Sequence, residues 1–226
     1  MVEMAIVLVI ISLLVGGIIL GENLIRQYEI RKTVSRIDQF RTSINSFRTQ
    51  FDGLPGDLKN AEDFWGTTNP GTLNGNGDRV IEFSNSDGVF EGYRAWQQMG
   101  LAEVTEGRYA GTQTTGVAEL DIDIPSCGLG GGFAIEHDAF GLSGQLVLLL
   151  GQPAASSTTM IMNGSIKPDV ATDIDLKVDD GLPDTGAVRG AAGANETSGN
   201  CIILDGDTHK YDLTKPGKAC TLGFQM

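Results

Sequence analysis

The chain has 226 residues, with thirty-one glycines and seven prolines, and its many Asn, Asp, Ser and Thr residues after position 52 favour one loop-rich body with strands over a helical bundle. The formal net charge is −13, and residues 53–226 hold ten Lys and Arg against twenty-four Asp and Glu. Because phosphate neutralisation requires clustered basic side chains, no general nucleic-acid binding is expected.

The first predicted element is an uncharged apolar run over residues 4–21. A helix of this length spans about 27 Å, which is close to the hydrocarbon thickness of a bilayer. A secretory signal has a basic stretch before the apolar run and a small-residue cleavage site after it, and neither pattern is found here. The run is therefore expected to stay on the protein as a membrane segment.

Glu3 lies directly before this run. A carboxylate at membrane depth is costly unless it stays among the headgroups or meets a cation. Glu3 is therefore either part of an ordinary anchor or a charge reserved for an assembly contact. Within the run, Gly16, Gly17 and Gly21 would let helices approach closely in lipid, and they would also weaken the helix locally.

The helical pattern continues beyond the membrane run without a break. Apolar residues recur mostly every three or four positions, and they are Leu24, Ile25, Tyr28, Val34, Ile37, Phe40, Ile44, Phe47 and Phe51. No proline occurs before Pro55, and residues 53–56 form a stop signal. We expect one helix over residues 1–52, about 75 Å long, with a membrane or filament-core segment at 1–21 and an amphipathic stem at 22–52.

Residues 53–226 are expected to form one globular body. The strand candidates are 80–83, 133–136, 146–150, 160–162 and 201–204, and residues 91–101 are typical of a short helix. The stem aromatics Tyr28, Phe40, Phe47 and Phe51 are expected to pack the stem against the sheet. The fold class is therefore α+β, with a long N-terminal helix packed on an antiparallel sheet.

The pairing of the three cysteines indicates the redox state of the compartment in which the protein folds. Cys201 and Cys220 enclose 18 residues and are a plausible disulfide pair, which would imply an oxidising compartment. The alternative is that all three cysteines are free thiols. If the pair forms, Cys127 is left unpaired unless it bonds another subunit.

Two acidic loops are candidate calcium sites. Asn74, Asn76 and Asp78 alternate with glycine, a spacing that offers oxygen ligands as at the opening of a calcium loop, although the twelfth position from Asn74 is Asn85 rather than Glu. A second cluster comprises Asp173, Asp175, Asp179, Asp180 and Asp184, with Asp179 and Asp180 as the candidate ligands. A plain turn is the alternative for each loop.

An enzymatic function is not expected. His137 and His209 are the only histidines, and the chain has no HExxH motif, no CxxC motif and no phosphate-binding glycine loop. His137 lies between Glu136 and Asp138, His209 lies close to Asp207, and both are interpreted as solvated loop or strand residues.

The N-terminal residues Met1-Val2-Glu3-Met4-Ala5-Ile6-Val7-Leu8-Val9-Ile10 resemble the start of processed type IV pilins and pseudopilins. Aligning the glutamates places Met1 at the third position of the family, so the methylated first residue of the family is not assigned to Met1. The body also resembles a subgroup of bacterial pilin-like proteins. The resemblance lies at residues 54–57, 65–66, 74–78, 93–96 and 179–183 and in the terminal cysteine pair.

The resemblance implies a structural subunit that anchors in the inner membrane, is processed by a prepilin peptidase and is polymerised by the pilus assembly machinery. In pilins the carboxylate equivalent to Glu3 is thought to pair with the N-terminal amine of a neighbouring subunit, which would set the subunit register. The expected location is an extracellular filament, and the family uses are adhesion, motility, DNA uptake and secretion. A minor pilin or secretion pseudopilin is one alternative, and a membrane-anchored protein that binds cations or a ligand outside the cytoplasm is another.

Overall fold

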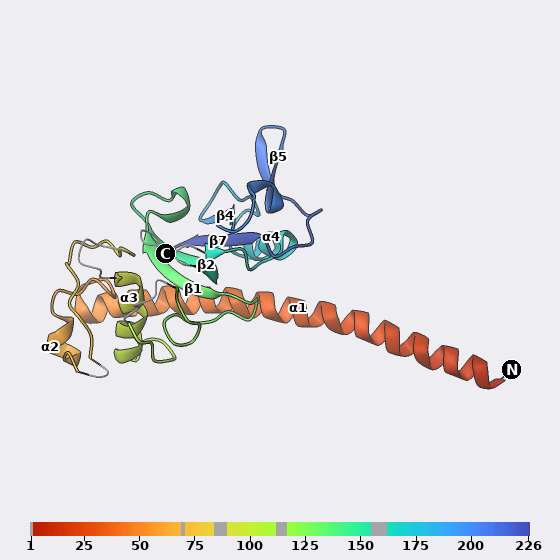
Figure 1. The fold of residues 1–226 in the computed structure, drawn as a ribbon, viewed down its shortest axis with the longest axis horizontal. Coiled ribbons are helices and arrows are strands. Elements are labelled where there is room, and N and C mark those ends of the chain that lie inside the picture. Colours follow the sequence, from red (N-terminus) through yellow and green to blue (C-terminus); the bar gives the residue numbers. More distant parts are fainter. Residues whose placement is uncertain (1, 69–70, 84–89, 112–116, 155–161) are drawn as a thin grey trace.

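One long helix dominates the computed structural model of the chain (Figure 1). The structure describes residues 2–68, 71–83, 90–111, 117–154 and 162–226. Helix α1 (Val2–Phe51) contains 50 residues without interruption and is followed by a turn at residues 52–57. Asp52 and Gly56 have positive φ angles of 51° and 89° in this turn. The expected N-terminal helix and its end are thus confirmed.

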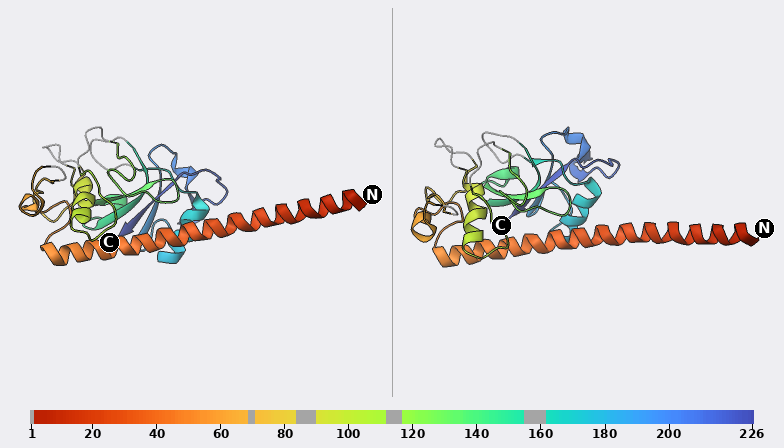
Figure 2. Two further views of the ribbon diagram at one scale, coloured as in Figure 1. Left: turned by 90° about the horizontal axis from the view of Figure 1, so that it is seen from below. Right: turned by 60° about the horizontal axis from the view of Figure 1, so that its bottom comes forward.

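The two halves of α1 have different surroundings. The N-terminal half projects away from the body, whereas the C-terminal half lies along it (Figures 1 and 2). The buried residues of α1 recur at the spacing of one helix face, and they include Ile30, Ile37, Phe40, Ile44 and Phe47. This stripe forms one wall of the hydrophobic core.

The body contains one mixed-length antiparallel sheet. Its strands are β1 (Gly132–His137), β2 (Leu146–Pro153), β3 (Met162–Asn163), β4 (Val188–Ala192) and β7 (Cys220–Gln225). The order is β1-β2-β7-β4, with β3 paired to β2, and every pairing is antiparallel. An antiparallel-sheet body behind a long helix agrees with the predicted α+β class.

Shorter elements surround this sheet. The helices are α2 (Ala61–Trp65), α3 (Glu91–Leu101) and α4 (Pro168–Val178), with 3-10 turns η1 (Ala139–Gly141) and η2 (Ser198–Asn200). Strands β5 (Ile202–Asp205) and β6 (Thr208–Tyr211) form a separate hairpin. Helix α3 lies near the C-terminal end of α1, and α4 lies near its middle (Figure 2).

Several predicted elements differ from the observed ones. Residues 80–83 were expected as a strand but belong to no sheet, because their backbone groups bond instead to His137 and to the Glu91 carboxylate. Residues 160–161 lie outside the described part of the chain, and β3 starts at Met162. The sequence patterns missed α4, β4, β6 and β7, whereas the helix at 91–101 is confirmed.

The Cys201–Cys220 disulfide predicted from the sequence is present. Both cysteines are fully buried, and the bond ties the start of the β5–β6 hairpin to the first residue of β7. The third cysteine, Cys127, is buried and free. The disulfide therefore secures the hairpin to the strand that lies between β2 and β4.

Replacing Cys201 and Cys220 together with alanine is expected to lower the free energy of unfolding by about 3 kcal/mol, because the 18-residue loop is no longer closed in the unfolded chain. Urea titration of the full chain in detergent, followed by near-UV circular dichroism, measures this change. The Cys127→Ala variant is the control and should still lose stability on reduction. A double variant as stable as the oxidised parent would contradict the prediction.

Candidate functional site

The exposed half of α1 is the largest feature that the body does not cover. An 18-residue window of this helix has a mean hydropathy of 2.9 and is 0% buried within the chain. Its leucines are among the most exposed, with Leu8 at 66% and Leu13 at 72%. By length and composition this helix is able to cross a membrane. So much apolar surface requires a cover, either lipid or other helices.

The exposed surface extends farther along α1 than expected. Leu24, Ile25 and Tyr28 were predicted to belong to the stripe that packs on the body, but they are 72%, 61% and 64% exposed. The stripe starts at Ile30 instead. The expectation that Tyr28 packs against the sheet is therefore wrong, because the body does not reach this turn on that side of the helix. Phe40 and Phe47 are buried as predicted.

The predicted assembly residues all lie on this protruding half. Glu3 is exposed in the first turn of α1, and it forms no ion pair with any residue that the structure describes. A Cβ atom at Gly16, Gly17 or Gly21 would meet nothing within 4 Å. Nothing within the folded chain therefore requires glycine at these three positions, which leaves helix flexibility or contacts outside the chain as the physical reasons.

The first candidate calcium loop is occupied by its own hydrogen bonds. The Asn74 side-chain oxygen accepts from the backbone N–H of Glu62 at 3.0 Å. The side chain of Asn76 donates to Asp78 Oδ2 at 2.9 Å and accepts from the Asp78 N–H at 2.9 Å, while Asp78 Oδ1 accepts from the N–H of Val80 at 2.8 Å. This arrangement is that of a side-chain-stabilised turn, and calcium coordination here stays a prediction.

Two buried carboxylates accept hydrogen bonds from the backbone of this loop and its neighbours. Asp57 accepts hydrogen bonds from the N–H groups of Gly77 and Arg79. Glu91, which is 0% exposed, accepts from the N–H groups of Asn76 at 3.4 Å and Glu82 at 3.1 Å. Neither role was predicted from the sequence, where Asp57 occurs only within the resemblance at residues 54–57 and Glu91 only as the first residue of the predicted helix.

Burial controls the titration of these carboxylates. Loss of solvation raises the pKa of Glu91 to about 7, and the nearby negative charges of Asp57 and Asp78 add to this effect. Loss of solvation also raises the pKa of Asp57, although its backbone hydrogen bonds oppose the increase. Arg94, which is 4% exposed, donates to the Asn74 carbonyl at 2.7 Å and lies near Glu91.

The second candidate calcium site brings three carboxylates together. Asp175, Asp179 and Asp180 each place a carboxylate oxygen within 4.8 Å of the others. Asp175 is fully buried on α4 and accepts a hydrogen bond from the Tyr211 hydroxyl at 2.8 Å. Burial raises its pKa to about 6 against the lowering effect of that hydrogen bond. As in the first loop, these groups also accept hydrogen bonds within the chain, Asp179 from the N–H of Val188 at 3.2 Å and Asp180 from the N–H of Leu182 at 2.9 Å. Calcium coordination by the three carboxylates stays a prediction.

The two histidines and the free cysteine were considered as possible catalytic groups. His137 lies at the end of β1, where its Nδ1 accepts from the N–H of Ile81 at 2.8 Å and burial lowers its pKa. His209 is exposed on β6 and pairs with Asp184. Burial raises the pKa of Cys127, which disfavours a thiolate nucleophile. No nucleophile with an adjacent base occurs among these residues.

Comparison with known proteins identifies no relative of this chain. No family model matches it, and neither a curated protein nor a solved structure matches it significantly.

Stability is expected to fall as the pH rises from about 4.5 to 7. In this range the folded chain keeps the Glu91 proton that the unfolded chain has lost, because the pKa of Glu91 is raised to about 7. Glu91 alone is expected to change the free energy of unfolding by about 3 kcal/mol across the range. Urea titrations at several pH values measure this slope.

The Glu91→Gln variant should show a shallower slope, because the contributions that remain are those of Asp175, whose pKa is raised to about 6, and Asp57, opposed by His137, whose lowered pKa makes stability rise with pH. Glu106→Gln changes an exposed glutamate and serves as the control, with the parental slope expected. An unchanged slope in the Glu91 variant would show that this carboxyl does not titrate in the range.

Calcium at about 10 mM is expected to raise the melting temperature by about 5 °C, because a cation relieves repulsion among Asp175, Asp179 and Asp180 in the folded state. Thermal melting with and without calcium measures the shift. Asp180→Ala should abolish it, whereas Asp78→Ala should leave it unchanged. A shift that persists in Asp180→Ala, or disappears in Asp78→Ala, would assign calcium elsewhere.

Proposed function

We propose that the chain is a structural subunit, a pilin, of a type IV pilus-like extracellular filament. The observation that carries the proposal is the division of α1, in which an 18-residue apolar window is 0% buried while the later turns bury one face against the body. A membrane covers that window before assembly, and the helices of other subunits cover it in the filament. The resemblance of residues 1–10 to processed pilins supports the same function.

The partners follow from this function. Before assembly the subunit lies anchored in the inner membrane, where a prepilin peptidase and the pilus assembly machinery act on it. After assembly it contacts copies of itself in a helical homopolymer at the bacterial surface. The disulfide supports a body outside the reducing cytoplasm.

Within the filament, Glu3 sets the register of each subunit against its neighbour. Helices that exchange lipid for a protein core gain little apolar burial, so packing and polar contacts supply the specificity. A carboxylate left unpaired in such a core costs several kcal/mol, which disfavours every register that lacks its cationic partner. Gly16, Gly17 and Gly21 allow the close approach of neighbouring helices.

Two other functions compete with this proposal. A minor pilin or a type II secretion pseudopilin would share the same helix but would start a filament rather than form its bulk, and its low abundance in purified filaments would reveal it. A membrane-anchored protein that binds cations is favoured only by the carboxylate cluster at Asp175, Asp179 and Asp180. Such a protein would remain in the membrane without polymerising.

Glu3→Gln is expected to reduce filament yield at least tenfold while leaving membrane insertion intact, because the substitution removes the charge but keeps the size of the side chain. Filaments sheared from cells and quantified by electron microscopy and immunoblotting measure the yield, and alkaline extraction of membranes measures insertion.

Glu22→Gln is the matched control, because Glu22 lies on the same helix, is exposed and carries the same charge. It should assemble normally. Parental filament yield from Glu3→Gln would remove Glu3 from the assembly contact, and equal losses from both variants would point to a general effect of helix charge.

A further inference from the structure

A pocket of about 310 Å³ lies where α1, the loop at residues 127–131 and the start of α4 meet, and it is named the α1–α4 pocket below. The charged residues that line it are Arg26, Lys167 and Lys218, which are basic, and Glu29 and Asp169, which are acidic. Arg26 is already paired with both Asp169 at 2.8 Å and Asp173 at 3.0 Å. Among the lining residues, the charges that form no ion pair with a described residue are two lysines, Lys167 and Lys218, against one carboxylate, Glu29.

The pocket also contains hydrogen-bond donors without partners. Ser165 is 2% exposed, and its hydroxyl makes no hydrogen bond with any described residue. The Nε atom of Arg26 is buried and likewise unpartnered among the described residues. Lys218 donates to the Leu129 carbonyl at 2.9 Å, which leaves two of its three N–H groups available. The complement of such a set is an oxygen atom that accepts hydrogen bonds.

Helix α4 adds to the same preference. It starts at Pro168 and has 11 residues; its N-cap residue Lys167 forms no side-chain cap, and Asp169 Oδ1 in the first turn accepts from the N–H of Val170 at 2.9 Å. The N-terminal end of a helix dipole is positive, and this end of α4 lines the pocket through Lys167, Asp169 and Val170. The helix end, the lysines and the unpartnered donors all favour an anion.

The position of the pocket along α1 indicates where the anion comes from. Arg26 lies five residues beyond Gly21, the end of the apolar run, which corresponds to about 7.5 Å along a helix. The headgroup layer of a bilayer is about 5–8 Å thick on each side. When residues 4–21 occupy the hydrocarbon, Arg26 on the wall of the α1–α4 pocket lies in the outer part of the headgroup layer, which puts lipid phosphates next to the pocket.

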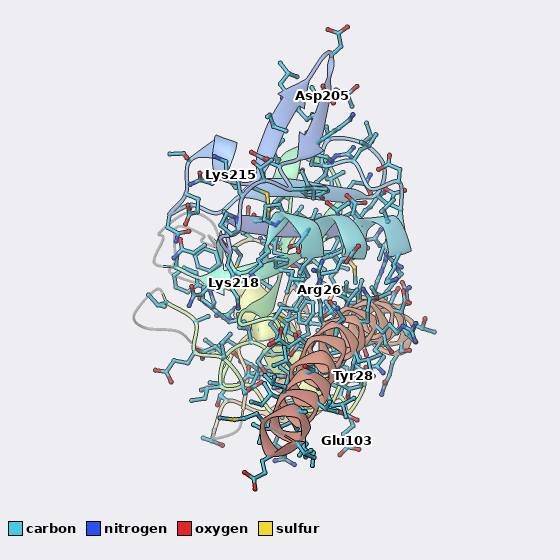
Figure 3. The ribbon with its side chains drawn as sticks, turned by 90° about the vertical axis from the view of Figure 1, so that its right-hand side faces the viewer. Arg26, Tyr28, Glu103, Asp205, Lys215 and Lys218 are labelled. Atoms are coloured by element: carbon cyan, nitrogen blue, oxygen red, sulfur yellow. A yellow bond between two sulfur atoms is a disulfide. The ribbon has the colours of Figure 1, made fainter. Side chains whose placement is uncertain are left out.

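The same end of the body presents one further labelled lysine, Lys215. Figure 3 views the molecule from the N-terminal end of α1 and shows Arg26, Lys215 and Lys218 on this side, together with the acidic Glu103 and Asp205. Lys215 does not line the pocket. It therefore separates general attraction to an anionic membrane from binding in the pocket.

We propose that the α1–α4 pocket binds the phosphate group of an anionic phospholipid while the subunit is anchored in the membrane. The inference rests on the membrane anchoring included in the proposed function. Lys218 and Lys167 supply charge, the Ser165 hydroxyl donates a hydrogen bond, and the start of α4 faces the phosphate. The bound lipid holds the body against the membrane surface until the subunit leaves the bilayer.

The test uses the full chain reconstituted in vesicles of phosphatidylcholine with 20% phosphatidylglycerol. After extraction in mild detergent, mass spectrometry measures the ratio of the two lipids retained per protein. The parent is expected to retain phosphatidylglycerol about tenfold above its share in the vesicles, and Ser165→Ala and Lys218→Gln should each lower this enrichment about tenfold.

Lys215→Gln is the matched control, with the same loss of charge on the same end of the body, and should keep the parental enrichment. Ser165→Ala removes a hydroxyl without a partner among the described residues, so its melting temperature should equal that of the parent. Equal losses in Lys215→Gln and Lys218→Gln would overturn the site in favour of diffuse attraction. Parental enrichment in Ser165→Ala and Lys218→Gln together would also overturn it.

A separate arm distinguishes the lipid from free phosphate. Inorganic phosphate at 10 mM is added to the chain in pure phosphatidylcholine vesicles, and hydrogen exchange of residues 163–171 is measured. Protection that equals the protection given by phosphatidylglycerol, and that disappears in Ser165→Ala, would assign the pocket to free phosphate and overturn the lipid assignment. Little protection by phosphate supports the lipid.

Lipid binding in the pocket and membrane anchoring of α1 are tested by separate measurements. Resistance of the chain to alkaline extraction from pure phosphatidylcholine vesicles reports insertion of α1 alone. A chain that inserts without phosphatidylglycerol enrichment overturns only the pocket, whereas a chain that fails to insert overturns the anchoring on which the pocket depends. If no lipid is enriched and Ser165→Ala instead reduces filament yield, the pocket contacts a neighbouring subunit and the lipid assignment is overturned.

Discussion

The contact of Phe40 with Trp96 and Phe133 joins the three main parts of the body. Phe40 comes from α1, Trp96 from α3 and Phe133 from β1, and the ring centroids are 4.8 Å and 5.1 Å from that of Phe40 in edge-to-face arrangements. The guanidinium of Arg36 lies 5.7 Å and 5.9 Å from the Phe40 and Phe133 rings. Such contacts combine apolar burial with a preferred geometry, so the direction of α1 relative to the sheet is fixed here.

These contacts hold the C-terminal half of α1 against the body. The N-terminal half makes no such contacts with the described part of the chain and stays exposed. The ion pairs of Arg26 with Asp169 and Asp173, at 2.8 Å and 3.0 Å, are the contacts of the body nearest to the apolar window. They join α1 to α4 through groups that tolerate water, which suits a boundary between lipid and solvent. The molecule thus has an apolar half, a polar boundary and a packed half on a single helix.

The sequence allowed the parts with a regular period to be predicted. The apolar run, the stripe through Ile37, Phe40 and Ile44 and the turn after Phe51 identified α1, and the aromatic pattern of residues 91–101 identified α3. Helix α4 was missed because three aspartates in 11 residues hide its buried positions Val170, Ala171 and Ile174. Strand β7 was missed because its Gly223 interrupts the usual strand composition.

The candidate sites were less predictable than the fold. The oxygen-rich spacing of Asn74, Asn76 and Asp78 was visible in the sequence, but only the structure shows that Asn76 and Asp78 bond to each other and that Asn74 bonds to the backbone of Glu62. The carboxylates that accept hydrogen bonds from the backbone of this loop are Asp57 and Glu91. They are separated from each other by more than thirty residues in the sequence, and only the fold brings them together. The α1–α4 pocket likewise combines segments around residues 26, 129, 166 and 218.

The strand order has a consequence for how the body folds. Strand β7 lies between β2 and β4, although it follows both in the chain. Until residues 220–225 have been synthesised, β2 and β4 cannot be joined, and the Cys201–Cys220 disulfide cannot form. Contacts between distant segments form slowly, so the sheet is completed only after most of the chain has been made. If α1 is anchored as proposed, the helix holds the unfinished chain at the membrane during that interval and limits its encounters with other unfinished chains.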